Sequence, residues 1–390
     1  MSGGQKTKVF LAGITIHQSE LILLDEPSNH LDILGRQLLY DFIQSTKYSL
    51  IIISHDRKLL NLLDTVCELN KNGIKVYGGN YDFYKEQKKI DANALNQDIQ
   101  SKEKELKKAK EKERGTLERQ QKLDSRGKGK QEKSGVARIM MNTLRNNAEN
   151  STAKLKGIHA EKIGNIKQEL QNLRFSLSET EQMKLDFDNS KLHKGKNIFK
   201  ADNINFAYKN EKYLWNESQS FQISSGERIG VKGANGSGKT TLIKLIIGNL
   251  IPQIGSIFIA KSKIIYIDQD YSLINNNQKI YEQAQQSNIS ALKEHEVKMR
   301  LNRFLFTKDD WDKPCSVLSG GEKMRLMLCC LNISNQSPDV IVLDEPTNNL
   351  DIQNLEILSN AINEYKGTLL VISHDETFLE EININRTIQL

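Results

Sequence analysis

The chain has 390 residues, of which 38% are hydrophobic and 27% are charged, and its formal net charge is +6. This length accommodates two or three domains, and a mild basic excess spread over so long a chain is mostly solvated surface. No run of about 18 apolar residues occurs and the first residues lack a signal-peptide core, which argues against a helical membrane span and predicts a cytoplasmic protein.

Cysteines are few and show no CxxC spacing, which fits a reducing compartment. Cys329 and Cys330 are adjacent within an apolar stretch that we expect to be helical. We predict that these two, together with Cys67 and Cys315, are small buried hydrophobic residues.

The N-terminal part of the chain, residues 1–82, repeats motifs that recur within residues 191–390, and we call these the first and second copies. SGGQK at Ser2 recurs as SGGEK at Ser319, and LILLDEPSNHLD recurs as VIVLDEPTNNLD. In both copies 30 residues separate the first acid of the DE pair from the histidine of ISHD. Three motifs in one order at matched spacing indicate a duplicated domain.

Residues 83–190 separate the copies and are rich in Lys, Glu and Gln. Their first part predicts a long polar helix with charge pairs four residues apart, and SRGKGKQEKSG predicts a break. A second helix is predicted from one apolar stripe, formed by Leu155, Ile158, Ile163, Ile166, Leu170, Leu173 and Leu177. We expect an antiparallel hairpin with a basic loop, Arg126 to Lys130; the alternative is a solvated linker.

In the second copy, GANGSGKTT follows an apolar strand and opens an amphipathic helix, which is the context that a phosphate-binding P-loop requires. Backbone N–H groups would surround the phosphates, Lys239 would contact the β- and γ-phosphates, and Thr240 would ligate Mg²⁺. The predicted nucleotide-binding residues of this loop are Gly233, Ala234, Asn235, Gly236, Ser237, Gly238, Lys239, Thr240 and Thr241.

Two acids end the apolar strand VIVLDEP. Asp344 is suited to Mg²⁺, and Glu345 can polarise an attacking water; the alternative is an acidic turn. Tyr208, upstream of the P-loop, could stack on adenine or pack in the core. The SGGE serine and glycines at a helix start could bind an anion or serve as an ordinary N-cap.

These motifs together resemble the ATP-binding-cassette superfamily, and two copies with a charged helical linker resemble its ABC-F class. The resemblance spans essentially the whole chain. It implies an α/β fold of P-loop cassettes, one partial (1–82) and one complete (191–390), joined by an α-helical hairpin (83–190). It implies ATP and Mg²⁺ as cofactors, Gln269 as a catalytic and metal-contacting residue, and His374 as the histidine that holds the γ-phosphate.

The first copy departs from this pattern. It has the signature Ser2-Gly3-Gly4 and residues Asp25, Glu26 and His55, but its front half with a P-loop is missing, and we expect a gene fragment or a misplaced start. One composite site could then be complete, closed by Ser2, Gly3 and Gly4. The other would leave Ser319, Gly320 and Gly321, with Asp25, Glu26 and His55, without a P-loop to serve.

The resemblance further implies an ATPase that acts on the ribosome through its linker, in translation or in antibiotic protection; the residues do not decide which. The basic loop suits RNA backbone contact by charge, and DNA is an alternative. Two other hypotheses are the ATP-binding subunit of a membrane transporter and a non-catalytic remnant that binds ATP without turnover.

Overall fold

The computed structural model describes residues 9, 12–14, 16, 20–29, 31–70, 73–131, 138–175, 193–208, 212–334, 338–348 and 350–390. The chain forms two compact units, Phe83–Ser178 and a larger one built from Met1–Asp82 with Glu179–Leu390. Within the described ranges, none of the helices combines the length and apolar character needed to cross a bilayer.

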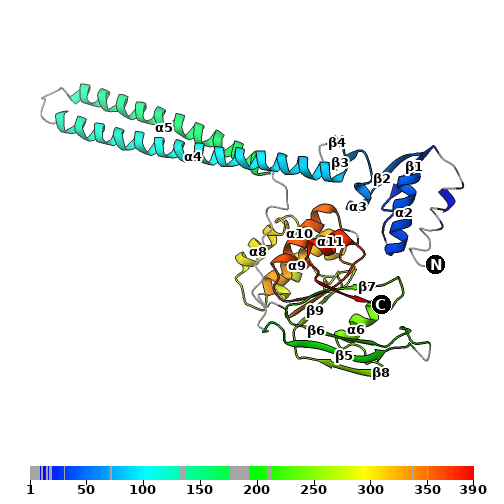
Figure 1. Cartoon of the computed structure of the whole chain (residues 1–390). Helices are drawn as coiled ribbons and strands as arrows, with labels where there is room; N and C mark the ends of the chain where they lie inside the picture. Colours follow the sequence, from blue (N-terminus) through cyan, green and yellow to red (C-terminus); the bar gives the residue numbers. More distant parts are fainter. Residues whose placement is uncertain are drawn as a thin grey trace. The chain divides into compact units, whose positions relative to one another are not determined.

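The second copy is built on a five-stranded parallel sheet in the order β12-β7-β11-β10-β9, with a three-stranded antiparallel sheet, β6-β5-β8, beside it (Figure 1). Its strands are β5 (Asn197–Asn205), β6 (Gln219–Ser224), β7 (Arg228–Lys232), β8 (Ile254–Ile259), β9 (Ile264–Ile267), β10 (Val340–Asp344), β11 (Thr368–Ile372) and β12 (Arg386–Gln389). Its helices are α6 (Lys239–Ile246), α7 (Ile280–Gln286), α8 (Glu294–Arg303), the 3₁₀ turn η2 (Cys315–Val317), α9 (Gly320–Ser334), α10 (Ile352–Glu364) and α11 (Glu376–Glu381).

Both faces of the parallel sheet are buried, so its central strands need apolar side chains on both sides. Accordingly, β10 is apolar except at its last residue, Asp344, and β11 is apolar except at its first residue, Thr368. One face packs against α6 and the antiparallel sheet, and the other against the helices α7 to α11. The α/β fold predicted from the sequence is confirmed.

The first copy repeats the C-terminal elements of the second copy, from β10 through α10 to β11. Its elements are β1 (Leu21–Asp25), α2 (Ile33–Ser45), β2 (Ser49–Ile53), α3 (Arg57–Leu60), β3 (Val66–Asn70) and β4 (Gly73–Tyr77). Strands β1 and β2 pair in parallel with Asp25 opposite Ile53, just as Asp344 lies opposite Ile372 in the second copy. Asp32 caps α2 and Asp351 caps α10 through the same bond to the N–H three residues on.

The two copies differ in what covers this pair of strands. In the second copy, alternate side chains of β10 and β11 pack against α6; in the first copy, their counterparts are exposed. The exposed set is Leu21, Leu23, Ile51 and Ile53, and its buried counterparts are Val340, Val342, Leu370 and Ile372. The first copy therefore presents an apolar outer face, defined by these four residues, where the second copy has a core.

Matched substitutions at one strand position test this difference. Leu23 is 66% exposed and Val342 is 0% exposed. We expect Leu23→Lys to change the free energy of unfolding by about 0.5 kcal/mol or less, because the ammonium stays in water. Val342→Lys should cost several kcal/mol, because it buries an unpaired charge. Urea unfolding of both variants checks this, and equal losses would mean that the outer face of β1 is covered in solution.

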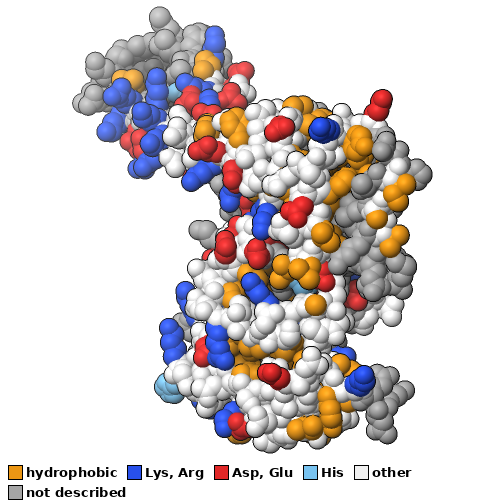
Figure 2. All heavy atoms as spheres, turned by 45° about the vertical axis from the view of Figure 1, so that its right-hand side comes forward, with side chains coloured by type: hydrophobic (Ala, Val, Ile, Leu, Met, Phe, Trp, Pro, Cys, Tyr) orange, Lys and Arg blue, Asp and Glu red, His pale blue; other side chains and the backbone are white. Residues whose placement is uncertain are grey.

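The smaller unit holds α4 (Tyr81–Gln131), whose first two residues belong to the larger unit, and α5 (Arg138–Phe175), which run side by side as a hairpin (Figure 1). Lys102 pairs with Glu169 at 2.6 Å and Glu103 pairs with Arg174 at 2.5 Å. Basic and acidic side chains are interspersed along the described part of its surface (Figure 2).

Three expectations about individual residues need correction. The first seven residues of the predicted break, Ser125–Gln131, continue α4, since long polar helices tolerate glycine at modest cost, and α4 ends within that segment at Gln131. Ile158 is 55% exposed, so the apolar stripe is narrower than predicted and is buried at Ile163, Ile166 and Leu170. Cys67 is exposed, because β3 pairs only with β4 and one face of that hairpin is open; the other three cysteines are buried. Leu177 lies outside the described residues.

Candidate functional site

The P-loop joins the end of β7 to the start of α6. Gly236 and Gly238 have φ of 84° and 92°, a left-handed conformation that favours glycine. A Cβ on Gly233 would lie 2.4 Å from Ser237 Oγ, so the loop closes too tightly for a side chain there. The loop thus presents backbone groups, with Ala234 and Asn235 between its glycines, at the positive end of α6.

Trp215 supports the loop from beneath. Its Nε1–H donates to the carbonyl of Ser237 at 2.9 Å, and its indole lies 3.1 Å from where a Cβ of Gly238 would be. Our sequence analysis did not identify this residue. The available signal was the position of this tryptophan shortly before a strand, because the indole N–H of a buried tryptophan needs a hydrogen-bond acceptor.

Lys239 is the first residue of α6 and turns back over the loop. Its ammonium donates to the carbonyls of Gly233 at 2.8 Å and Ala234 at 3.2 Å, and it lies 3.2 Å from Nε2 of His374. Burial lowers the pKa of Lys239, although the carboxylates of Glu345 and Asp344 oppose that shift. Lysine, loop and histidine therefore converge on one point at the carboxyl end of the sheet.

Asp344 ends β10 beside this point. Its Oδ2 accepts from the hydroxyl of Tyr266 at 2.9 Å and from Thr240 Oγ1 at 3.4 Å. Burial raises the pKa of Asp344, and these hydrogen bonds oppose the shift. Tyr266 is a second residue that sequence reasoning missed, although its place on β9 before Gln269 was a usable signal.

Glu345 follows in a left-handed conformation with φ of 49°, held by a bond of 2.9 Å from its N–H to the carbonyl of Ile372. Its carboxyl lies 3.4 Å from Nε2 of His374. Burial raises the pKa of Glu345 to about 7, and burial beside Lys239 lowers the pKa of His374 to about 4. His374 is therefore neutral at neutral pH and can accept the hydrogen bond from Lys239.

The other predicted residues lie around this centre. Gln269 is exposed just after β9, and Tyr208 is 43% exposed with its hydroxyl 3.0 Å from Thr241 Oγ1. Ser319 forms a capping box with Glu322 at the start of α9, where Gly320 follows and Gly321 packs against Asn354. Ser2, Gly3 and Gly4 lie outside the described residues.

The first copy repeats the acidic part of this geometry. Glu26 has φ of 43°, its N–H donates to the carbonyl of Ile53 at 2.8 Å, and His55 lies 3.4 Å from its carboxyl. Burial raises the pKa of Glu26, with neighbouring Asp25 adding to the effect. Strands β1 and β2 thus end with the same acid and histidine arrangement as β10 and β11. The sequence contains a single G-x-x-x-x-G-K-[ST] segment, which belongs to the second copy.

The residues of the second copy fit a nucleotide with Mg²⁺. Ser237 Oγ is buried in the P-loop and has no hydrogen-bond partner among the described residues, and the space beside Gly236 is open. Thr240 and Asp344 offer two oxygens, 3.4 Å apart. That suits a cation that takes one or two protein ligands and completes its shell with phosphates and water.

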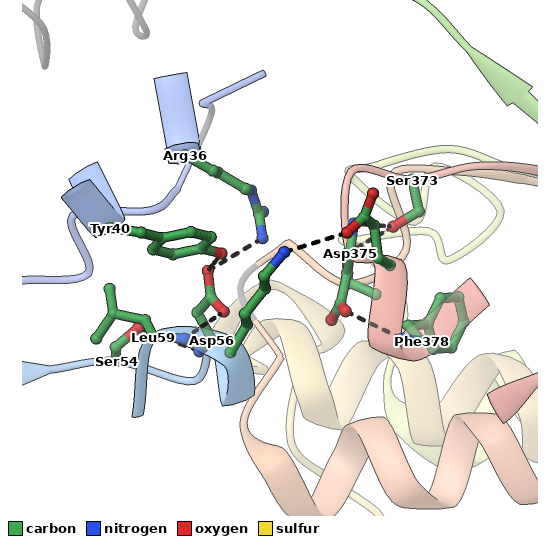
Figure 3. Close-up of polar contacts among 11 residues, drawn as sticks. Arg36, Tyr40, Ser54, Asp56, Leu59, Ser373, Asp375 and Phe378 are labelled. Carbon is green, nitrogen blue, oxygen red and sulfur yellow. Dashed lines mark hydrogen bonds and ion pairs between the residues drawn. The ribbon is translucent and has the colours of Figure 1, made fainter. Parts of the chain in front are cut away.

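The two copies meet beside these sites, within the larger unit. Asp56 caps α3 and accepts from Arg36 at 3.2 Å and from Tyr40 at 2.7 Å; Figure 3 shows this group facing Asp375, which caps α11 in the same way. A cavity of about 160 Å³ lies there. It is lined by Glu26, Ser28, Asn29, Arg36, His55 and Asp56 of the first copy and by Thr347, Asn348, Leu350, Leu355 and Asp375 of the second.

Comparison with known proteins agrees with this geometry. The family described as "ABC transporter" matches residues 217–348. "ATP-binding protein Uup" of Buchnera aphidicola is 32% identical over 97% of this chain and 58% of its own length. "ABC transporter F family member 5" of Arabidopsis thaliana is 32% identical over 100% of this chain and 51% of its own length. The chain thus spans a little over half the length of these two relatives.

A solved structure shares the fold at greater distance. An archaeal ribosome recycling factor, crystallised with the ribosomal stalk protein aP1, aligns with a TM-score of 0.59 and 20% identity. The alignment covers 100% of this chain and 61% of that one. A P-loop before α6, paired acids at the end of β10 and a histidine after β11, on one parallel sheet, define an ATP-binding-cassette protein. Within that superfamily, the chain belongs to the ABC-F class.

Proposed function

We propose that the chain binds ATP with Mg²⁺ at Gly233 to Thr241 and hydrolyses it to ADP and phosphate. One observation carries the proposal: Nε2 of His374 lies 3.2 Å from the ammonium of Lys239 and 3.4 Å from the carboxyl of Glu345. A cation for phosphate, a carboxyl for water and a neutral imidazole are the groups that phosphoryl transfer to water needs.

Each group has a distinct task. Lys239 leaves the carbonyls of Gly233 and Ala234 for the more negative phosphate oxygens, because an ammonium binds an anion more strongly than a neutral dipole. Glu345 accepts a proton from the attacking water, and its pKa near 7 places it close to the operating pH for that exchange. Neutral His374 orients the terminal phosphate from its place beside Lys239 and Glu345.

Mg²⁺, when bound, neutralises charge on the phosphate oxygens. Thr240 and Asp344 would hold it, with Gln269 completing the contact from the end of β9. Tyr208 would stack on the adenine, because its ring is part exposed and its hydroxyl is already fixed by Thr241. Ser2, Gly3 and Gly4 would close this site, and Ser319, Gly320 and Gly321 would face the acids of the first copy.

We further propose that the partner is the ribosome, reached through the α4–α5 hairpin, in translation or in protection from antibiotics. The support is the ABC-F class together with a long hairpin that carries many Lys and Arg residues and few aromatic ones. Such a surface suits RNA backbone contact rather than base stacking. Phosphate release from ATP, measured with and without ribosomes, tests the proposal; absence of release in both conditions would reject hydrolysis.

Charge reversal at the hairpin tests the partner separately. Arg126, Lys128 and Lys130 belong to α4, and their side chains lie outside the described part. Replacing all three with Glu should weaken ribosome binding and reduce its salt dependence, since each lost phosphate contact removes roughly 0.7–0.9 units of the log–log slope. Co-sedimentation at several salt concentrations measures this. An unchanged slope would mean that these residues do not touch RNA backbone.

A further inference from the structure

The contact between the copies brings equivalent parts of the duplicated domain face to face. Residues at the same repeat position, 319 apart in number, line the same cavity from both sides. These matched pairs are Ser28 with Thr347, Asn29 with Asn348, Arg36 with Leu355, and Asp56 with Asp375. The copies therefore pair as two related domains do about a two-fold axis.

Charge breaks this symmetry. The first copy contributes cations and the second contributes anions. Lys58 lies 3.3 Å from Glu376, and Arg57, with its side chain 3% exposed, forms an ion pair with Glu381. Arg36 and Arg57 also act on the half-buried Asp375, whose pKa they pull down against the larger effect of desolvation. A cation as buried as Arg57 needs an anion opposite, because leaving it unpaired is costly.

Another molecule of the same chain could compete for this surface, because residues 191–390 of that molecule form a complete cassette. At the three cationic positions that cassette has different residues: Leu355 for Arg36, Glu376 for Arg57 and Thr377 for Lys58. If two such cassettes paired in the same geometry, the Arg57–Glu381 contact would become Glu376 against Glu381. Symmetry would produce that like-charge contact twice, and the half-buried Asp375 would lose both cations.

We propose that the surface formed by Arg36, Arg57 and Lys58 against Asp375, Glu376 and Glu381 selects the pairing partner by charge. It accepts the first copy of the same chain and rejects the complete cassette of a second chain. Like charges across an interface exclude a wrong partner more effectively than attraction alone selects the right one. The inference concerns pairing and holds whether or not ATP is hydrolysed.

Three variants of the full chain test it by sedimentation equilibrium, with and without Mg²⁺ and ATP. Glu376→Arg and Glu381→Arg each turn the rejecting Glu–Glu contact into an Arg–Glu contact, made twice per dimer. Each single variant should therefore self-associate about tenfold more tightly than the wild type. The double variant places Arg against Arg and should return to the weak self-association of the wild type.

Glu380→Arg is the matched control, because Glu380 is exposed on the same helix and the change in net charge is the same. It should behave as the wild type does. A double variant that is soluble and monomeric would also show that the fold tolerates Arg at both positions, including opposite Arg57. Self-association of the double variant as tight as that of the singles would overturn the proposal, as would wild type that dimerises as tightly as Glu376→Arg.

Discussion

Replacing Glu345 with Gln should slow single-turnover hydrolysis by about 10²–10⁴-fold while leaving ATP binding unchanged. The amide keeps the shape of the carboxyl, and the backbone bond from residue 345 to Ile372 does not depend on the side chain. An amide cannot accept the proton of the attacking water. Nucleotide binding, measured with a fluorescent ATP analogue, and phosphate formation after mixing with excess protein separate the two effects.

Glu26→Gln is the internal control for that experiment. Glu26 has the same left-handed backbone and the same 3.4 Å distance to its histidine as Glu345 has. The chain has no lysine-bearing loop in the first copy to bring a phosphate to it, so we expect turnover close to that of the wild type. Equal losses in the two variants would mean that the reading of a single competent site is wrong.

Lys239→Ala should reduce ATP binding below detection. The ammonium is the cation within the P-loop, and the sequence provides no second P-loop to compensate. Removing it takes away the full positive charge that the protein itself supplies, because the backbone N–H groups and the helix dipole carry only partial charges. Titration with the fluorescent analogue measures the loss.

Lys244→Ala controls for charge and helix content, because Lys244 is exposed in the last turn of the same helix α6. Its affinity for ATP should match that of the wild type. Stoichiometric binding retained by the Lys239 variant would place the nucleotide elsewhere and remove the basis of the proposed function.

Local chemistry made much of the fold predictable. Strands β10 and β1 were evident as apolar runs ending in acids, and the P-loop was evident because glycines sat between a strand and a helix. Because the two copies share these motifs, an element predicted in one copy could also be predicted in the other. The α4–α5 hairpin followed from charge periodicity, although Ser125–Gln131 remained helical because isolated glycines cost a helix only about 1 kcal/mol each.

Contacts between distant parts of the chain were not predictable. Local signals drew attention to Tyr266 and Trp215, but their partners Asp344 and Ser237 follow from strand register and packing. Our sequence analysis assigned no role to Arg57, and only the fold places it against Glu381, more than 300 residues away. Cys67 was misassigned because an apolar residue type predicts burial on average, whereas exposure at an open hairpin depends on what covers it.

Helix α4 has a mechanical consequence. Its 51 residues extend about 75 Å at 1.5 Å per residue. Its first turn is fixed to the first copy: Tyr81 is 3% exposed, and the N–H of Asp82 donates to Asn61 at 2.9 Å. For any straight helix of that length, a rotation of about 5° about one end displaces the other end by about 6.5 Å.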